Sequence, residues 1–468
     1  MDYEVLVFLS DKHSGSVCGY AGDPVVRTPN LDRIAAAGAV FTNAYTSCPL
    51  CVPARASFMT GRYPLDIGVI DNAQGFASQE PTFAHCLGIN GYQTSLIGRM
   101  HFLGLDQRHG FDQRLADDIT QTYWGGKCLD IANVKRDVHE IFPVEKTESY
   151  QYDHYVVEKA LEYLDQEHKE KQMMVVGTYM PHVPLGAPEE LVDYYRDKMQ
   201  KTPHNLVMPY PCDGVSKVRK IFGSDDEARN NEERAYYYAM IETEDKLVGQ
   251  VYDKFHEYCE KKGKPGIFIY LSDHGDMMGD KGLFEKSTFF EYASKIPMIV
   301  QVDGMKHQEI STPVSIMDIS ATLCALTESP ALPYGEGRDL SKAIAGETLE
   351  EIPIISNILG SGKRIDEHHF GTMVRYKNYK FITYAGLEAQ DLLFDIEADP
   401  AEHKNLIHEK SDIADTLRAI AAEHNKGNEV KIQKCLESCE GPASKTNNIG
   451  ILRTWGESRQ YINETWHI

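Results

Sequence analysis

Several apolar runs in the first two thirds of the chain each end directly in a polar loop. They are Glu4–Ser10, Tyr92–Gly98, Met173–Met180 and Gly266–Ser272. Continuous apolar runs of this length are typical of strands that are buried on both faces, as in a parallel sheet. Segments with helical spacing, such as Gln151–Glu170, lie between them. The pattern predicts an α/β structure built on a parallel sheet.

The pattern changes near residue 352, where apolar and aromatic residues begin to alternate with polar ones. Thr372–Tyr384 and Asp391–Ile396 alternate in this way, which predicts a small antiparallel sheet. Ile413–Ala422 has helical spacing, and a polar segment follows it. We therefore expect a large domain over 1–351, an antiparallel subdomain over 352–425 and a C-terminal extension over 426–468.

The composition excludes some classes of partner. The chain has 468 residues and a formal net charge of −22, which argues against nucleic acid and against an anionic membrane as a partner. No apolar run approaches membrane-spanning length, and the opening MDYEVLVFLSDK lacks the basic region of a secretory signal. The ten cysteines are scattered, so we expect reduced thiols and a cytoplasmic location.

Acidic residues follow two of the predicted strands. Asp11 comes directly after the first strand, and Asp273 and His274 come directly after Gly266–Ser272. Open α/β sheets place their ligand crevice at the carboxyl ends of the strands. One such acid alone more often caps a turn. Two strand-end carboxylates and a histidine together predict a site for a hard divalent cation.

The most informative stretch surrounds Cys51. Pro53 fits the first turn of a helix over Ala54–Thr60, and Gly61 fits the position just past its end. Cys51 would then lie beside a helix N-terminus, where free N–H groups and the helix dipole favour an anion. Arg55 adds a planar cation suited to oxyanions. The stretch predicts a reactive group that faces a tetrahedral oxyanion.

Basic side chains also follow two other strands. Arg99 and His101 come directly after Tyr92–Gly98, and His182 lies between two prolines after Met173–Met180. Loops at strand ends commonly carry binding residues, so these side chains are candidates for an anion site.

The motifs together resemble those of the type I sulfatases. They are FLSD at 8–11, TPNLDRIAAAG at 28–38, CVPAR at 51–55, GRMHFLG at 98–104, PHVP at 181–184, SDHGDMMGDKGLFEK at 272–286 and LLFDIEADPAEHKNL at 392–406. The resemblance reaches to about residue 425. It implies the alkaline phosphatase-like fold, which is a large mixed, mostly parallel sheet between helices with a small C-terminal antiparallel α+β subdomain.

The resemblance implies a sulfatase that hydrolyses a sulfate ester. In this family the motif cysteine is oxidised to Cα-formylglycine by a maturation enzyme, which implies that modification at Cys51. One hydroxyl of the formylglycine hydrate attacks sulfur, and the other then expels sulfate as the aldehyde re-forms. The resemblance further implies Ca²⁺, or another divalent cation, held by Asp11, Asp273, His274 and residue 51.

Matching positions supply the remaining roles. Arg55, His101, His182 and Lys286 would be catalytic beside Cys51, and Arg99 and Asn72 would bind the substrate. Lys12 departs from the family, which has a second metal-binding Asp or Gln there. An ammonium group cannot bind a cation. The site therefore has fewer protein ligands, with water or His13 filling in, or Lys12 turns away or replaces part of the cation's charge.

Two alternatives remain at this point. A phosphonate monoester or phosphodiester hydrolase would use the same residues, and Lys12 leaves room for a non-catalytic binding homologue. Cys48 and Cys51 also form a C-x-x-C pair, as in a redox protein or half a zinc site, but neither explains Arg55.

The sequence leaves the organic part of the substrate open. We expect a small-molecule or oligosaccharide sulfate ester. Specificity loops are expected near 105–150, 200–230 and 360–370, where His368 and His369 are candidates for the pocket. A homo-oligomer is left open.

Overall fold

The computed structural model describes residues 2–72, 74–75, 77–104, 106–119, 141–142, 144, 147–201, 207–215, 218–219, 222–359 and 369–433. Much of the predicted specificity loops, His368 and most of the predicted C-terminal extension lie outside the described residues. Among the described residues, no helix is both long enough and apolar enough to cross a membrane.

The centre of the molecule is an eight-stranded mixed sheet with the strand order β10-β2-β9-β7-β1-β6-β4-β5. Its strands are β1 Glu4–Asp11, β2 Ala39–Phe41, β4 Tyr92–Gly98, β5 Gln113–Ala116, β6 Lys171–Pro181, β7 Gly266–Ser272, β9 Met298–Val302 and β10 Gln308–Ile310. β1 pairs in parallel with β6 and with β7, whereas β9 runs antiparallel to its two neighbours. The predicted mostly parallel sheet is confirmed.

Both faces of the sheet are covered, which explains the continuous apolar runs. Along β1, Leu6 and Phe8 belong to one buried cluster, and Val5, Val7 and Leu9 belong to another. Because successive side chains of a strand point to opposite faces, each face of β1 contributes to its own core.

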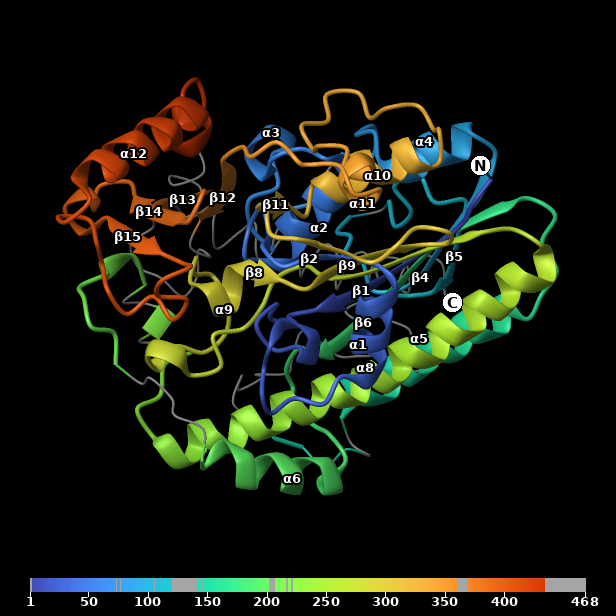
Figure 1. The fold of residues 1–468 in the computed structure, drawn as a ribbon, viewed down its shortest axis with the longest axis horizontal. Coiled ribbons are helices and arrows are strands. Elements are labelled where there is room, and N and C mark those ends of the chain that lie inside the picture. The colour runs from blue at the N-terminus through green and yellow to red at the C-terminus, as the bar shows by residue number, and fades with distance from the viewer. Residues whose placement is uncertain are drawn as a thin grey trace, which may run out of the picture.

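Two groups of helices form the outer layers (Figure 1). One layer contains α1 Pro29–Ala37, α5 Glu148–Leu164, α6 Glu189–Met199 and α8 Glu227–Lys262. The other contains α2 Cys51–Thr60, α3 Pro64–Ile67, α4 Phe83–Ile89, α10 Asp318–Leu326 and α11 Ser341–Ile344. α5 starts before the predicted Gln151. It also ends before the predicted Glu170, since the chain leaves the helix at Asp165.

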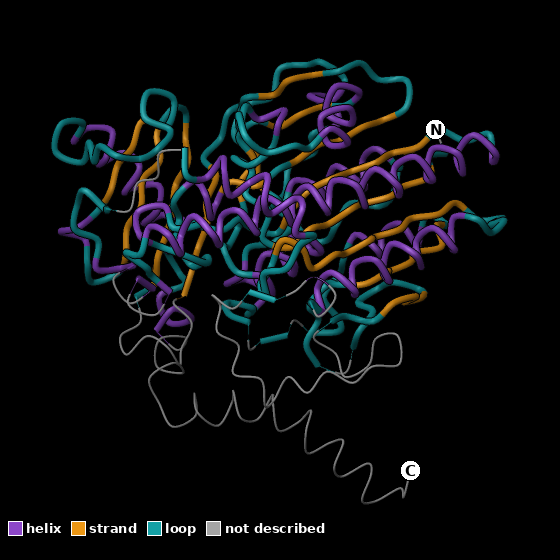
Figure 2. The backbone as a smooth tube through the Cα atoms, turned by 90° about the horizontal axis from the view of Figure 1, so that it is seen from below, coloured by secondary structure: helices purple, strands orange, loops and turns teal. Residues whose placement is uncertain are grey.

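A second sheet lies at one end of the molecule, as Figures 1 and 2 both show. It is antiparallel and contains β12 Ile354–Leu359, β13 Phe370–Tyr376, β14 Tyr379–Tyr384 and β15 Leu392–Asp395. The predicted antiparallel sheet is confirmed, with β12 as an additional strand. The domain boundaries at 351 and 425 stay predictions.

The two faces of this small sheet have different partners. Val374 and Phe381 pack on Leu417 of α12 Ser411–Asn425. On the opposite face, Met373 and Ile382 belong to a cluster with Phe289 and Phe290, which follow Lys286 in the chain. The small sheet therefore supports the loop that carries a predicted catalytic lysine.

The remaining elements are short. They are the three-stranded sheet of β11 Val314–Ser315, β3 Ala44–Tyr45 and β8 Lys295–Ile296, the helix α9 Glu291–Ser294, and the 3₁₀ turns η1 Gly19–Ala21, η3 Asp213–Val215, η4 Asp280–Gly282 and η5 Glu388–Gln390.

Candidate active site

The predicted cation ligands meet at the carboxyl ends of β1 and β7. The two strands are paired in register, with Ser10 opposite Ser272, so Asp11 at the end of β1 and Asp273 just after β7 follow paired residues. Ligand atoms of Asp11, Cys51, Asp273 and His274 all lie within 4.8 Å of one another, and all four residues are buried. The register of the sheet therefore creates this cluster.

Cys51 is the first residue of α2, so the helix begins earlier than the predicted Ala54. Leu50 precedes it in an extended conformation and provides no side-chain cap. Asn72 supplies one instead, because its Oδ1 accepts the N–H of Val52 at 2.9 Å. Gly61 ends the helix at φ +66°, as predicted. The sulfur thus lies at the N-terminus of a fully buried helix.

Two arginines hold the carboxylates from behind. Arg55 donates from Nε to Asp273 Oδ2 at 2.7 Å and from Nη2 to Asp11 Oδ2 at 3.1 Å. Arg99 donates from Nε to Asp11 Oδ2 at 2.5 Å. Both arginines therefore engage Oδ2 atoms, and the Oδ1 atoms of the two carboxylates lie nearest Cys51 and His274. Burial raises the pKa of Asp11, but Arg99, His182 and Arg55 outweigh it and hold the pKa well below its usual range.

The orientation of His274 leaves one ring nitrogen for a cation. Its Nδ1 lies 2.9 Å from the carbonyl oxygen of Gly275, which can only accept, so Nδ1 carries a proton. A neutral ring then has a lone pair on Nε2, which lies 3.2 Å from the sulfur of Cys51. A metal-binding histidine usually donates its other ring N–H to a carbonyl or a carboxylate, as His274 does here.

His182 and Lys286 form a hydrogen-bonded pair beside Cys51. His182 Nδ1 lies 2.8 Å from the carbonyl oxygen of Val183 and must donate to it. Its Nε2 therefore accepts from Lys286 Nζ at 2.7 Å. Burial and Lys286 both lower the pKa of His182, which favours this neutral ring.

His101 approaches the sulfur from another side. Arg99 Nη2 donates to His101 Nδ1 at 3.0 Å, which leaves the proton of a neutral ring on Nε2. Burial raises the pKa of the Cys51 thiol, but Lys286, His274 and a hydrogen bond with His101 lower it well below its usual range. The site is thus built to stabilise negative charge at residue 51.

Two residues of this site were not predicted. Asp118 accepts from Arg99 Nη1 at 3.0 Å and from the backbone N–H groups of Met100 and His101 at 3.0 and 2.6 Å. The ring of Tyr179 lies 4.6 Å from the Arg99 guanidinium and 4.7 Å from the His182 ring. Asp118 follows another aspartate in a loop, so the sequence alone had no signal to select it.

Lys12 turns away from the cluster. Its backbone N–H donates to Asp273 Oδ1 at 3.1 Å, but its Nζ lies 2.6 Å from Asp276 Oδ2 and 2.5 Å from Glu285 Oε1. His13 does not take its place, because its ring nitrogens contact the hydroxyl of Tyr270 and the carbonyl of Val17. Of the alternatives predicted for Lys12, the structure shows the one in which the side chain turns away from the cation site.

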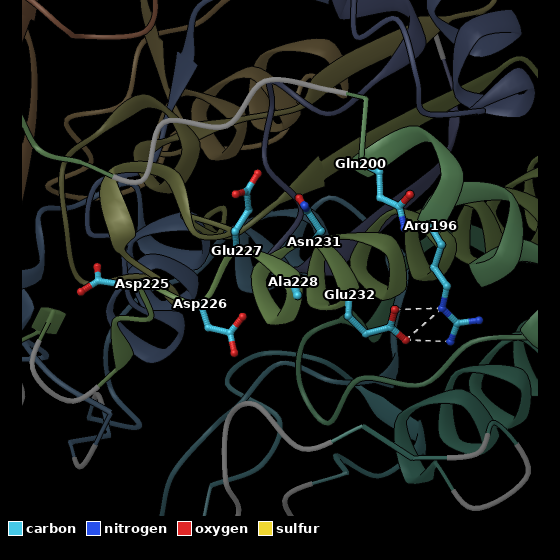
Figure 3. Close-up of a pocket in the computed structure, with 8 residues that line it drawn as sticks. All are labelled: Arg196, Gln200, Asp225, Asp226, Glu227, Ala228, Asn231 and Glu232. Atoms are coloured by element: carbon cyan, nitrogen blue, oxygen red, sulfur yellow. Dashed lines mark hydrogen bonds and ion pairs between the residues drawn. The ribbon is translucent and has the colours of Figure 1, made fainter.

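All ten predicted site residues are joined by these contacts. His369 hydrogen-bonds to the carbonyl of Ala385, which directly follows β14, and its place in the substrate pocket stays a prediction. A cavity of about 650 Å³ is lined by the C-terminal half of α6 and the start of α8, and contains none of the predicted site residues (Figure 3). Its lining residues are Arg196, Gln200, Asp225, Asp226, Glu227, Ala228, Asn231 and Glu232.

Comparison with protein families identifies the scaffold. The family model described as Sulfatase matches residues 4–329. The chain belongs to the sulfatase family. This sulfatase is 31% identical to the choline-sulfatase of Rhizobium meliloti over 86% of its own length and 82% of the relative's. It is 24% identical to the arylsulfatase of Clostridium perfringens over 92% of its own length and 95% of the relative's.

Solved structures support the same fold. The phosphonate monoester hydrolase of Agrobacterium radiobacter superposes with a TM-score of 0.75 at 18% identity, over 90% of this chain and 96% of that one. A structure in complex with its substrate D-glucosamine-2-N,6-O-disulfate superposes with a TM-score of 0.74 at 20% identity, over 91% and 98%. The sulfatase has the alkaline phosphatase-like fold and is a sulfuric ester hydrolase.

Proposed function

We propose that this sulfatase cleaves its sulfate ester with a formylglycine formed from Cys51, beside a bound divalent cation. The observation that supports it most is the position of Cys51 at the first turn of α2, where its sulfur lies 3.9 Å from Asp11 Oδ1 and 3.2 Å from His274 Nε2 and is also close to His182. The formylglycine hydrate would supply the nucleophile, and the cation would lower its pKa and polarise the sulfate.

The residues present fit a divalent cation. The cluster offers two carboxylates, which are donors that suit Ca²⁺ and Mn²⁺, and His274 Nε2, which has a lone pair when the ring is neutral. Arg55 and Arg99 fix both carboxylates from behind, so the donors stay in place without the ion. We propose Asp11, Asp273, His274 and residue 51 as its ligands, and Ca²⁺ as the first ion to test.

Basic and polar side chains around residue 51 would bind and orient the sulfate. Arg99 is fixed by Asp11 and Asp118, so its charge is held in one position beside the site. His101 would donate from Nε2 to an oxygen on residue 51. Asn72 contacts the backbone of Val52, which supports a role in holding the N-terminus of α2 besides substrate binding.

His182 and Lys286 would protonate the leaving oxygen. Lys286 donates to His182 Nε2, so this pair holds a proton beside residue 51. Burial lowers the pKa of Lys286, but Cys51 and Glu285 raise it above its usual range, so the lysine stays charged until it transfers a proton. General acid catalysis of this kind contributes about 10²- to 10⁴-fold.

Mass spectrometry and sulfate release together test the nucleophile. Cys51→Ala removes the modifiable side chain, and Cys48→Ser is the matched control in the same C-x-x-C pair. We expect formylglycine at residue 51 of the active wild-type protein, loss of sulfate release in Cys51→Ala, and activity in Cys48→Ser. Unchanged release from Cys51→Ala would refute the proposal, and loss in Cys48→Ser would favour a cysteine pair.

The substrate is a small-molecule or oligosaccharide sulfate ester in this proposal. The relatives suggest the panel: choline sulfate, an aryl sulfate and glucosamine-2-N,6-O-disulfate. A phosphonate monoester and a phosphodiester belong in the same panel, because a tetrahedral oxyanion site distinguishes them weakly. Faster turnover of either would identify a phosphonate or phosphodiester hydrolase, and no turnover with formylglycine present would identify a binding homologue. A maturation enzyme, a cytoplasmic location and the oligomeric state stay predictions.

A further inference from the structure

Lys12 lies in a buried group of alternating charges. Its Nζ contacts Asp276 and Glu285, and the other oxygen of Glu285 lies 3.5 Å from Lys286 Nζ. The four side chains are at most 9% exposed. Two lysines and two carboxylates therefore balance each other away from water, and one of these lysines, Lys286, belongs to the proposed proton donor.

We propose that Lys12 is a positioning residue for Lys286 and acts through Glu285. The inference rests on the proposed role of Lys286. With Lys12 in place, Glu285 Oε1 is engaged by Lys12, and only Oε2 faces Lys286, at 3.5 Å. Lys286 remains 2.7 Å from His182 Nε2. Lys12 thus prevents Glu285 from capturing the lysine that serves the leaving oxygen.

The loop that carries Lys286 depends on the same contacts. Asp276 Oδ1 accepts the N–H groups of Met278 and Glu285 at 2.8 and 3.1 Å, and the N–H of Met277 donates to the Glu285 carbonyl at 2.9 Å. These bonds close residues 276–285 into a compact loop. Lys12, at the end of β1, connects both Asp276 and Glu285 to the central sheet.

Removal of the ammonium group would release Glu285. A buried carboxylate that loses its cation is stabilised by pairing with another cation, because an unpaired buried charge is strongly unfavourable. Lys286 is the neighbouring cation, so Glu285 would move closer to Lys286 and compete with His182 for it. The backbone N–H of Lys12 would still donate to Asp273, so the cation site itself would not change.

The experiment compares Lys12→Met, Glu285→Gln and the double variant in the full chain. We expect Lys12→Met to lower kcat about 10- to 100-fold, as for other residues that position a reacting group, with KM nearly unchanged. The loss should be larger for a sulfate ester of a poor leaving alcohol than for 4-nitrophenyl sulfate, since only the former depends on proton donation. Because Glu285→Gln removes the competing charge, the double variant should recover most of the loss.

Lys281→Met is the matched control. Lys281 is another buried lysine of the loop, and it pairs with Asp280 and the carbonyl of Ala401 rather than with Glu285. It should change stability without the leaving-group effect. Equal losses for all leaving groups, additive effects of Lys12→Met and Glu285→Gln, or a fall in bound metal per chain in Lys12→Met would each overturn the inference.

A crystal structure of Lys12→Met, or of the double variant should the single one not fold, tests the inference without any activity. We expect Lys286 Nζ to leave His182 for Glu285 in the single variant and to stay beside His182 in the double one. Lys286 in its wild-type position in Lys12→Met, or displaced in the double variant, would refute the inference. Absence of sulfate release from the wild type would refute the proposed function instead.

Discussion

Asp118→Asn should slow the enzyme although Asp118 lies outside the predicted site. The buried carboxylate accepts three hydrogen bonds, from Arg99 Nη1 and from the backbone N–H groups of Met100 and His101. An asparagine has nearly the same volume but only one oxygen, so an NH₂ group must face one set of these donors. The change leaves no cavity, and its effect is therefore electrostatic.

The expected magnitude follows from the lost bonds. A hydrogen bond to a charged group contributes about 1.5–3 kcal/mol, which corresponds to a loss of about 10- to 100-fold in kcat/KM if Arg99 and His101 lose their orientation. Initial rates of sulfate release measure it, and thermal denaturation confirms folding. Asp117→Asn is the matched control, since its side chain is 58% exposed. Folded Asp118→Asn with a rate within about twofold of wild type would refute the reasoning.

Three other predictions concern stability and the cation. Lys380→Met leaves the buried Glu291 and Glu402 without their cation and should cost about 3–5 kcal/mol in urea denaturation; an unchanged midpoint would contradict it. Burial holds the pKa of His424 below its usual range, so the unfolded chain takes up the proton first as pH falls, and stability present above about pH 6.5 is lost below it. The protection factors of the α12 amides in hydrogen exchange should therefore fall in acid, and His424→Gln should abolish that fall. Chelation should abolish sulfate release but leave the circular dichroism spectrum unchanged, because Arg55 and Arg99 already neutralise the carboxylates; unfolding would show that the ion is structural.

The strands could be predicted from the sequence because burial on both faces leaves a continuous apolar run. The end of each run then located Asp11 and Asp273, and the parallel register brought them together. Helix boundaries also depend on contacts that are distant in the sequence. α2 begins at Cys51 because Asn72, distant in the sequence, caps its N-terminus, and no local pattern records that contact.

The supporting residues were beyond sequence reasoning for a similar reason. Asp118 and Tyr179 act on Arg99 only once β4, β5 and β6 lie side by side. The sequence showed that Lys12 could not bind a cation, but its carboxylate partners lie more than 260 residues away and become visible only in the folded chain.

The small sheet has a consequence for what counts as the enzyme. The sulfatase match ends at residue 329, yet Met373 and Ile382 pack behind Phe289 and Phe290, and Lys380 on β14 is tied to Glu291. Residues in the last quarter of the chain thus pack against the segment that follows Lys286. A protein shortened to the matched region would keep every proposed ligand of the cation. It would lack the packing that holds Lys286, which belongs to the proposed proton donor. The functional unit is therefore longer than the region that matches the family model. Loss of activity on truncation would result from lost packing and not from the loss of a reacting group.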